Sequence, residues 1–515
     1  MHWLKYYWPL IIVTAIAGMV RLICVLNSDL PTGDEINCYI SNAQRFAAHG
    51  RIPSLSDHPG VSMLYGMLML FLDSSRTVLP GVTAANIVTV LSGMIAAGFV
   101  YAALLHFADR QTAFLASLLL SVFPGCYFAI RGDLSLYFLF LSALLYSLSR
   151  LSINPSWRTA MITGIMAGCL YLCRSDGLYV SILTFVMAFL VLKDVRRFIP
   201  LMAAAFVLPL GLFFAARCSV MGIWGAGTGS RAFDAFYQAE GLHDGKGGSW
   251  QDYSRRGHNR FGPPKQYGNS LARLIISNSG AVSHRVMNNL TLVKQYIRDA
   301  TGVWSSLVLA AVACVFFDRR LLRMFVLVSL PCILTSCIYL AFYFQRSYFV
   351  MLSFGLVTAC AAGLSAVVLF AARKLKLDQY AFNSVVFMGI VLASFLGFRT
   401  YHSFPGSCRE TTSDRFGDSL VFIRNNCVSK GGKFFAFDHA GSRSMYVYAG
   451  GGDTAVMQHH ITGVEPDAAL KRLNAAGVSH ILAAKENKEL WELSGRLRIV
   501  FAGKHDDVRV LALEQ

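Results

Sequence analysis

Charged side chains are scarce in this sequence of 515 residues. Asp, Glu, Lys and Arg together make up 15% of it, whereas a soluble domain carries about 25%. Hydrophobic residues make up 55%. The low charge excludes an intrinsically disordered chain, and the composition lacks the glycine and proline content of a collagen-like protein. We therefore predict a membrane protein rather than a cytosolic one.

Acidic residues are the scarcer of the two charged classes. The chain has 29 Asp and Glu against 46 Lys and Arg, which gives a formal net charge of +17. In a soluble protein this excess would favour nucleic acid as a partner. The sequence has no zinc-finger spacing, no RNA-binding signature and no basic helix with interleaved aromatic residues. We expect no nucleic-acid partner and assign the excess charge to the flanks of membrane helices and to anionic lipid.

Motifs for structural metal or redox chemistry are also lacking. The twelve cysteines form no Cys-x-x-Cys pair, and most are scattered through apolar segments, where they serve as small hydrophobic residues. Cys408 and Cys427 both fall in the polar C-terminal part, and both a disulfide between them and two free thiols stay open. His459 and His460, near Asp453, lie in a polar stretch that is typical of solvated surface.

Long apolar runs are abundant, and eleven of them come close to the ~20 residues that a bilayer core requires. We predict spans at 8–26, 82–105, 112–130, 134–149, 157–173, 177–192, 198–216, 303–317, 324–342, 347–371 and 380–397. The apolar stretch 61–72 is shorter, because Asp73 and Arg76 follow it. We interpret that stretch as a juxtamembrane or re-entrant helix. The predicted fold class is an α-helical polytopic membrane protein with about eleven transmembrane helices.

Lys and Arg in the short connecting loops predict the orientation of the chain. One alternate set of these loops holds more than twice as many Lys and Arg residues as the other. This bias places the N-terminus in the cytoplasm and the C-terminal part in the periplasm, as in a multi-pass protein of the bacterial inner membrane. The first span is expected to stay as an anchor, because Arg21 lies within it and a motif-bearing loop follows.

This topology predicts two domains. Residues 1–397 form the transmembrane domain, with long external loops at 27–81 and 217–302, and residues 398–515 form a small extracytoplasmic α/β domain. In the latter we predict a helix over 466–476, which begins with Pro466 and is followed by Gly477. Predicted strands are 433–438, 444–449, 478–484 and 508–513. We expect function on the external side, because the long connections lie there.

The first external loop carries an acidic pair, Asp34 and Glu35, with Tyr39 shortly after it and Asp57 and His58 further on. Carboxylates beside a membrane are partly desolvated, which can raise a carboxyl pKa toward that of a useful general base. The alternative is a solvated pair in which Asp34 caps the following helix.

Three tight external turns each carry an arginine next to the membrane: Arg131-Gly132-Asp133, Arg174-Ser175-Asp176-Gly177 and Gln345-Arg346-Ser347-Tyr348. A single arginine there would serve as a lipid-headgroup anchor. Three arginines on the same side as an acidic pair predict a common cavity that binds phosphate, because the planar guanidinium group bonds phosphate oxygens bidentately.

The second long loop adds three more basic candidates for this cavity, Arg255, Arg256 and Lys265. Its glycine-rich beginning, 222–230, lacks the Lys-Ser/Thr ending of a phosphate-binding loop. We interpret that beginning as a flexible lid and predict an amphipathic helical stretch over 270–299.

Taken in order, these motifs resemble the GT-C superfamily of integral-membrane glycosyltransferases, which use polyprenyl-phosphate-linked sugars. The similarity covers roughly residues 8–370 and is greatest to the branch that holds the lipid A aminoarabinose transferases and the protein O-mannosyltransferases. The similarity is based on the following residues: Asp34-Glu35, Tyr39, Gly50, His58-Pro59, the turn Arg174 to Gly177, and Arg346 with Tyr348. Three positions depart from the family pattern: Gly60 in place of a second proline, Ser175 in place of a common proline, and Ser347 between Arg346 and Tyr348.

The resemblance implies a reaction in which an acceptor hydroxyl attacks the anomeric carbon of a polyprenyl-phosphate sugar. Asp34 is then the expected base or acceptor-orienting group, with Glu35 as second candidate, and a direct displacement inverts the anomeric centre. Arg346, Arg174 and Arg131 are expected to bind the donor phosphate, with Arg255, Arg256 and Lys265 in reserve. Positioning roles fall to Tyr39, Asp57, His58, Asp133, Asp176 and Tyr348. His58 is also the candidate ligand for a divalent metal ion, and we expect no other cofactor.

The acceptor stays open among membrane lipids such as lipopolysaccharide, other cell-envelope glycans and proteins. A transporter or flippase of a lipid-linked sugar is the first alternative, but Arg21 is nearly the only charge deep within a predicted span and we find no internal repeat. The second alternative is a non-catalytic assembly subunit, in which Asp34 and Glu35 would tolerate alanine.

Overall fold

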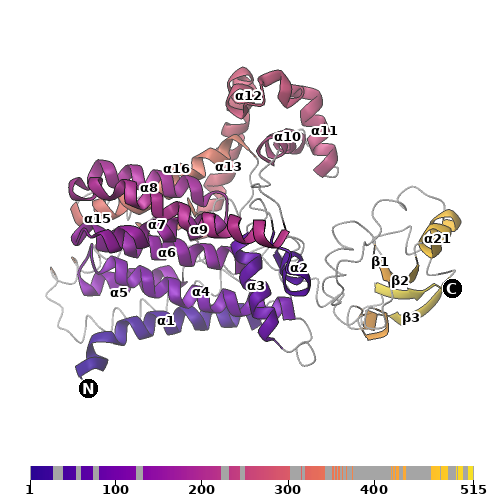
Figure 1. Ribbon diagram of the computed structural model, residues 1–515, viewed down its shortest axis with the longest axis horizontal. Coiled ribbons are helices and arrows are strands. Elements are labelled where there is room, and N and C mark those ends of the chain that lie inside the picture. Colours follow the sequence, from indigo (N-terminus) through magenta and orange to yellow (C-terminus); the bar gives the residue numbers. More distant parts are fainter. Residues whose placement is uncertain are drawn as a thin grey trace.

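The computed structural model describes most of the first 342 residues and part of the remainder. The described ranges are 2–26, 39–53, 59–72, 80–122, 132–221, 231–243, 250–301 and 319–342, with single residues or short runs between 315 and 374 and between 419 and 513. Figure 1 shows a bundle of long helices, a group of helices beside one end of it, and a small sheet.

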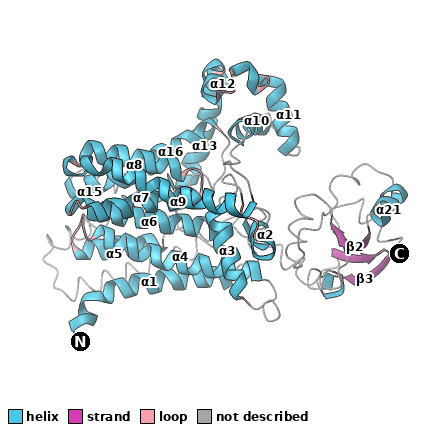
Figure 2. Cartoon of the chain, in the orientation of Figure 1, coloured by secondary structure: helices cyan, strands magenta, loops and turns pink. Residues whose placement is uncertain are grey.

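The bundle is built from apolar helices that lie side by side (Figure 2). They are α1 (His2–Leu26), α4 (Pro80–Leu104), α5 (Arg110–Val122), α6 (Gly132–Ile153), α7 (Trp157–Cys173), α8 (Gly177–Val191) and α9 (Ile199–Met221), with the 3₁₀ turn η4 (Lys193–Phe198) before α9. One further helical segment of the bundle is continuous over four elements: α15 (Arg319–Met324), the π-helical turn η7 (Phe325–Ser329), α16 (Leu330–Ile338) and the 3₁₀ turn η8 (Tyr339–Ala341). These helices confirm the corresponding predicted segments as helical.

Length and composition allow four of the described helical segments to cross a membrane: Gly81–Leu104, Leu134–Ile153, Lys193–Met221 and Arg319–Ala341. Tyr7–Ile23 and Gly177–Val191 are shorter apolar helices. Large apolar side chains face outward from the bundle; Leu212 on α9, for example, is 65% exposed, as a lipid-facing side chain would be. The segments 303–317, 347–371 and 380–397 lie wholly or mostly outside the described residues, so the count of eleven spans stays a prediction.

Helices α7 and α9 pack with almost no space between their backbones. Gly164 and Gly168 lie one turn apart on α7, and a Cβ added at Gly168 would lie 2.5 Å from the carbonyl oxygen of Phe206 on α9. A Cβ at Gly164 would overlap the carbonyl oxygen of Met202. This is the small-x-x-x-small pattern by which membrane helices approach each other closely.

Two shorter helices, α2 (Ser41–His49) and α3 (Pro59–Phe71), pack against each other at one end of the bundle (Figure 1). The shortness of α3 agrees with our interpretation of 61–72 as a helix that does not span. A Cβ added at Gly66 would lie 2.9 Å from the carbonyl oxygen of Ala43, so glycine is required for this contact between α2 and α3.

A helical insert occupies residues 231–301 and lies toward the same end of the bundle as α2 (Figure 1). It consists of α10 (Arg231–His243), α11 (Trp250–Phe261), the 3₁₀ turn η5 (Pro264–Tyr267), α12 (Leu271–Ser277) and α13 (Ser279–Thr301). A hydrophobic core of its own holds the insert together, from Phe236, Tyr237, Phe261, Leu274 and Val282. Helices α12 and α13 confirm the predicted helical stretch over 270–299. The glycine-rich segment 222–230 lies outside the described residues.

The C-terminal part contains a four-stranded sheet in the order β1-β2-β4-β3. Its strands are β1 (Lys433–Ala436), β2 (Val478–Ala484), β3 (Arg498–Ala502) and β4 (Val508–Ala512), and α21 (Pro466–Ala475) precedes β2. Strands β1 and β2 pair in parallel, whereas β4 is antiparallel to both β2 and β3. Gly477 has φ +71°, the left-handed conformation that terminates helices.

Three predicted strands and the predicted helix of this part are confirmed, while β3 was not predicted and 444–449 lies outside the described residues. Cys427 is a free, buried thiol, and its sulfur lies 3.4 Å from the Ser479 hydroxyl. Cys408, its candidate disulfide partner, lies outside the described residues.

Candidate functional site

Because successive helices of the bundle run in opposite directions, several segments that carry predicted site residues meet at one end of the bundle. The end of α7, the beginning of α8 and the end of η8 meet at this end, beside α2 and α3 (Figure 1). Of the predicted residues, Arg174, Asp176 and Tyr39 are described here with their side chains. Asp133 lies in α6, but its side chain is not described. Seven further predicted residues lie outside the described part of the chain: Asp34, Glu35, Asp57, His58, Arg131, Arg346 and Tyr348.

The turn between α7 and α8 holds a buried ion pair. Nε of Arg174 lies 3.2 Å from Oδ2 and 3.4 Å from Oδ1 of Asp176, and the two residues are 6% and 2% exposed. The backbone N–H of Gly177 donates to the Arg174 carbonyl at 3.0 Å, which closes the turn. A Cβ at Gly177 would lie 2.6 Å from the carbonyl oxygen of Leu170. Because Arg174 is buried, the interpretation of this arginine as a lipid-headgroup anchor is wrong.

Tyr137 extends this polar cluster into the bundle. Its ring lies beside the guanidinium group of Arg174, with 5.9 Å from the guanidinium carbon to the ring centroid. Asp176, Cys332 and Tyr339 lie within electrostatic range of its hydroxyl. That hydroxyl is buried and has no hydrogen-bond partner in the described part of the chain. A buried polar atom without a partner costs about 1–3 kcal/mol, so this position favours a role in binding a ligand.

The Pro59-Gly60 pair at the start of α3 lies against the end of α7. A Cβ added at Gly60 would lie 3.2 Å from both the carbonyl carbon and the carbonyl oxygen of Leu172, two residues before Arg174. Gly60, where the family pattern has a second proline, thus permits a close backbone approach. This contact ties the segment that follows His58 to the buried ion pair.

Tyr39 anchors the end of the first long loop. It is buried in the core of the bundle together with Ile40, and Ile40 occupies the space where Gly81 lacks a side chain. The chain is therefore fixed four residues after Glu35. A positioning role for Tyr39 stays a prediction, and its burial is what such a role requires.

The three reserve residues belong to the helical insert rather than to the bundle. Arg255 and Lys265 are exposed, and Arg256 lies over the ring of Tyr253 at 5.0 Å. The deeply buried arginine of the insert is Arg285, which our sequence analysis missed. Arg285 is 2% exposed. A guanidinium nitrogen of Arg285 lies 2.5 Å from Oε2 of Glu240, and its guanidinium carbon lies 4.6 Å from the ring centroid of Phe236.

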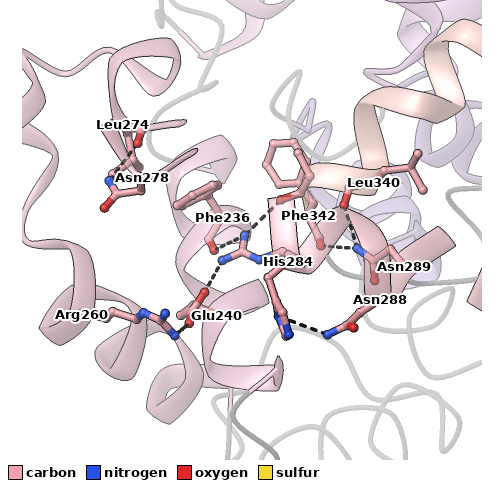
Figure 3. Close-up of polar contacts among 12 residues, drawn as sticks. Phe236, Glu240, Arg260, Leu274, Asn278, His284, Asn288, Asn289, Leu340 and Phe342 are labelled. Carbon is pink, nitrogen blue, oxygen red and sulfur yellow. Dashed lines mark hydrogen bonds and ion pairs between the residues drawn. The ribbon is translucent and has the colours of Figure 1, made fainter. Parts of the chain in front are cut away.

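Glu240 binds a second arginine, since Arg260 contacts its other carboxylate oxygen (Figure 3). Burial lowers the pKa of Arg285, while the hydrogen bond and the charge of Glu240 act in the opposite direction. On its other side Arg285 donates to the carbonyl of Ala341 at 3.0 Å, so the insert is bonded to the end of η8.

Comparison with known proteins identifies the fold. No protein-family model matches the chain, and no curated protein matches it significantly. Solved structures do match. ArnT from Cupriavidus metallidurans, bound to undecaprenyl phosphate, is similar over 98% of this chain and 98% of its own, with a TM-score of 0.63 and 11% identity. The oligosaccharyltransferase AglB from Archaeoglobus fulgidus, in complex with an inhibitory peptide and a dolichol-phosphate, is similar over 94% of this chain and 70% of its own, with a TM-score of 0.55 and 14% identity.

The chain has the GT-C fold. Both matches are GT-C membrane glycosyltransferases that depend on polyprenyl phosphate, so the resemblance that we derived from short motifs is confirmed at the level of the fold. The buried ion pair, Tyr137 and the helical insert all lie at or toward one end of this bundle.

Metal binding stays a prediction. Among the residues that the structure describes, no group of three or more His, Cys, Asp or Glu side chains could hold a metal ion. His58, the predicted ligand, lies outside them.

Proposed function

We propose that this protein is a membrane glycosyltransferase that moves a sugar from a polyprenyl-phosphate donor to a hydroxyl acceptor. The observation that carries the proposal is the buried cluster of Arg174, Asp176 and Tyr137, which lies at the end of a GT-C bundle. ArnT and AglB are bound to an undecaprenyl phosphate and a dolichol-phosphate, respectively, and this shared ligand chemistry supports a polyprenyl-phosphate donor here.

The reaction requires two separate electrostatic functions. The departing polyprenyl phosphate must be stabilised, and the acceptor hydroxyl must lose a proton as it attacks the anomeric carbon. Arg174 serves the first function together with Arg131 and Arg346, and Asp176 fixes the direction of its guanidinium group through Nε. Asp34 serves the second function, with Glu35 as the alternative, and the displacement inverts the anomeric centre.

We place the site on the periplasmic side of a bacterial inner membrane. In the structure, basic residues gather at the opposite end of the bundle, in the segments that begin or end the helices there: Arg110, Arg150, Arg158, Lys193, Arg196, Arg197, Arg319, Arg320 and Arg323. Such a bias marks the cytoplasmic side. The acceptor is a lipid such as lipopolysaccharide, another cell-envelope glycan or a protein.

A transport function has one observation in its favour. Arg21 is buried within α1, and its side chain fills the space above Gly93, in the middle of α4. It donates to the carbonyl of Ala17 on its own helix at 3.2 Å. Buried charges inside spans mark transport pathways in other membrane proteins. If the protein were a flippase, Arg21→Gln would abolish lipid translocation in vesicles, and no sugar would be transferred by the wild type.

The transferase proposal is tested with purified protein in lipid nanodiscs. Mass spectrometry of lipid extracts from cells with and without the gene first identifies a product that differs by one sugar, and transfer from radiolabelled polyprenyl-phosphate sugar is then measured. We expect Arg174→Ala to reduce transfer by about ten- to a hundred-fold, since a charge-assisted contact contributes about 1.5–3 kcal/mol.

Arg158→Ala is the matched control, because Arg158 lies at the opposite end of the bundle, beside the Trp157 ring. It should transfer at the wild-type rate. Arg174→Lys should recover only part of the activity, since a point charge cannot replace the planar fork. A folded Arg174→Ala protein with the wild-type rate would place the phosphate site elsewhere.

A further inference from the structure

Helix α9 has one buried face, and this face ends in an arginine. The buried residues of α9 are Met202, Ala205, Phe213 and Arg217, and their spacing places them on one side of the helix. Val207, on the other side, is exposed. Arg217 is only 8% exposed. Because burial of a charged side chain is costly, ionisable residues buried within membrane helices usually have a function.

The contacts between α7 and α9 show where Arg217 lies. Gly164 of α7 lies against Met202 of α9. One turn further along both helices, Gly168 lies against Phe206, so the two helices run in the same direction. Helix α7 ends five residues after Gly168, whereas Arg217 follows Phe206 by eleven residues. At about 1.5 Å per residue, Arg217 therefore lies beyond the end of α7, where the turn with the buried ion pair begins.

An apolar cluster connects Arg217 with Arg174. Phe213 of α9 and Ile52, from the segment before α3, form the centre of this cluster, and Leu172 of α7 packs against it. Arg217 follows Phe213 by four residues, or about one helical turn, and Arg174 follows Leu172 by two. Each arginine is therefore within about one turn of the same cluster, at the end of the bundle where α9 passes α2 and α3 (Figure 1).

Charge at this end of the bundle favours an anionic ligand. Among the described residues of α7, α8 and α9 and the turns between them, the buried charged side chains are Arg174, Asp176 and Arg217. Asp176 pairs with Arg174, and a phosphate group would supply further negative charge for the two arginines. An interaction of Arg217 with the dipole of α9 would be available to an exposed side chain as well, so it does not account for the burial.

We propose that Arg217 is a further donor-binding residue, which contacts the phosphate of the polyprenyl-phosphate sugar together with Arg174. The proposal rests on the proposed function, in which Arg174 binds that phosphate. The planar guanidinium groups of the two arginines come from different segments, α9 and the turn after α7, and each bonds phosphate oxygens. Both contacts strengthen as the departing phosphate gains negative charge during transfer.

The test measures the binding of two lipids to the purified full-length protein: undecaprenyl phosphate, and undecaprenol, which lacks the phosphate. Arg217→Met removes the charge and keeps a flexible, unbranched side chain that fills part of the same space. We expect this variant to bind undecaprenyl phosphate about ten- to a hundred-fold more weakly, as for the loss of a charge-assisted contact. Binding of undecaprenol should not change. Arg217→Lys should recover only part of the difference, since an ammonium group lacks the planar fork.

Arg51→Met is the matched control. Arg51 directly precedes Ile52 at the same end of the bundle, but its side chain is exposed. Its replacement should leave the binding of both lipids at the wild-type level. Equal weakening by Arg51→Met and Arg217→Met would show a general effect of positive charge and would overturn the proposal.

A structural role for Arg217 predicts a different result. If Arg217 only holds α9 against its neighbours, Arg217→Met should lower the thermal midpoint of unfolding and weaken the binding of both lipids alike, which would overturn the proposal. Weaker binding of the phosphate lipid alone, with an unchanged thermal midpoint, supports it. If Arg217→Met does not fold, Arg217→Lys is compared with the wild type on the same two lipids. A selective loss for undecaprenyl phosphate then supports the proposal, and an equal loss or no loss overturns it.

Transfer from a radiolabelled polyprenyl-phosphate sugar separates this proposal from the proposed function. A wild type that binds undecaprenyl phosphate but transfers no sugar refutes the transferase function, while selectively weaker binding by Arg217→Met still supports Arg217 as a phosphate-binding residue. A wild type that binds and transfers, with Arg217→Met unchanged in both, overturns the Arg217 proposal alone. A wild type that does not bind the lipid overturns both.

Discussion

Replacing Tyr137 by phenylalanine should move activity and stability in opposite directions. The Tyr137 hydroxyl is buried and has no hydrogen-bond partner among the described residues, so the native fold bears the cost of a desolvated polar atom. Removal of an unsatisfied buried group recovers part of about 1–3 kcal/mol. Tyr137→Phe keeps the ring that lies 5.9 Å from the Arg174 guanidinium carbon. We therefore expect a protein that is at least as stable as the wild type.

The expected effect on transfer has the opposite sign. If the hydroxyl contacts the donor in the cluster with Arg174 and Asp176, its loss removes one hydrogen bond, about 0.5–1.5 kcal/mol, or roughly two- to thirteen-fold in kcat/KM. The measurements are the thermal midpoint of unfolding in detergent and the initial rate of transfer from a radiolabelled polyprenyl-phosphate sugar.

The matched control for this substitution lies on the same helix. Tyr146→Phe, nine residues further along α6, keeps the ring contact with Phe99 at 5.6 Å and should leave transfer unchanged. A Tyr137→Phe protein that is more stable and fully active would show that the hydroxyl binds no donor. A protein that loses stability as well as activity would show that the hydroxyl has a structural partner, which would refute our account of the cluster.

Two further predictions concern stability. Gly168→Val should disrupt the contact between α7 and α9, because even a Cβ there would lie 2.5 Å from the Phe206 carbonyl oxygen; size-exclusion profiles should show loss of folded protein, whereas Gly211→Val, where a Cβ meets no atom within 4 Å, should not. Burial, with a smaller effect from Arg150, lowers the pKa of His106, so the unfolded chain binds the proton first as pH falls below about 6.5. Wild-type stability should therefore decline over about pH 6.5 to 5 more steeply than that of His106→Gln, and equal slopes would contradict this.

Much of the helical bundle follows from the sequence, because a segment in lipid must satisfy its backbone hydrogen bonds internally and therefore forms a helix. The apolar run 157–173 predicts the bounds of α7 as the structure has them, and 177–192 differs from α8 by one residue. In the C-terminal part, Pro466 and Gly477 predict both ends of α21 within one residue. These local signals require no knowledge of distant contacts.

Strand β3 gave no such signal. It is a partly exposed edge strand that begins with Arg498, and its register with β4 shifts between Ile499 and Phe501. Its side chains therefore lack the regular alternation of apolar and polar residues by which strands are recognised. Only its pairing with β4 makes it a strand.

The candidate site was predictable from sequence where a charged residue stands in a segment whose residues favour a tight turn. The motif Arg174 to Gly177 indicates a tight turn with an arginine, and the structure adds that its ion pair is buried. Tyr137 could not be found in this way. It is a tyrosine within an apolar run, and only the tertiary structure brings it next to Arg174 and Asp176 on other segments. Arg285 was missed for a similar reason, since an arginine on an amphipathic helix is usually solvated, and its partner Glu240 is 45 residues away.

The bonds between the insert and η8 use backbone carbonyls on the bundle side, and this has a consequence for how the two parts can vary. Every residue type presents the same carbonyl oxygen, so the side chains of Leu340, Ala341 and Phe342 are under no constraint from these bonds. The number of residues between α16 and Phe342 is constrained instead, because one residue inserted there would shift the carbonyls past their donors on α13, Arg285 and Asn289. These bonds therefore limit the length of the junction rather than its composition, whereas they limit the identity of Arg285 and Asn289.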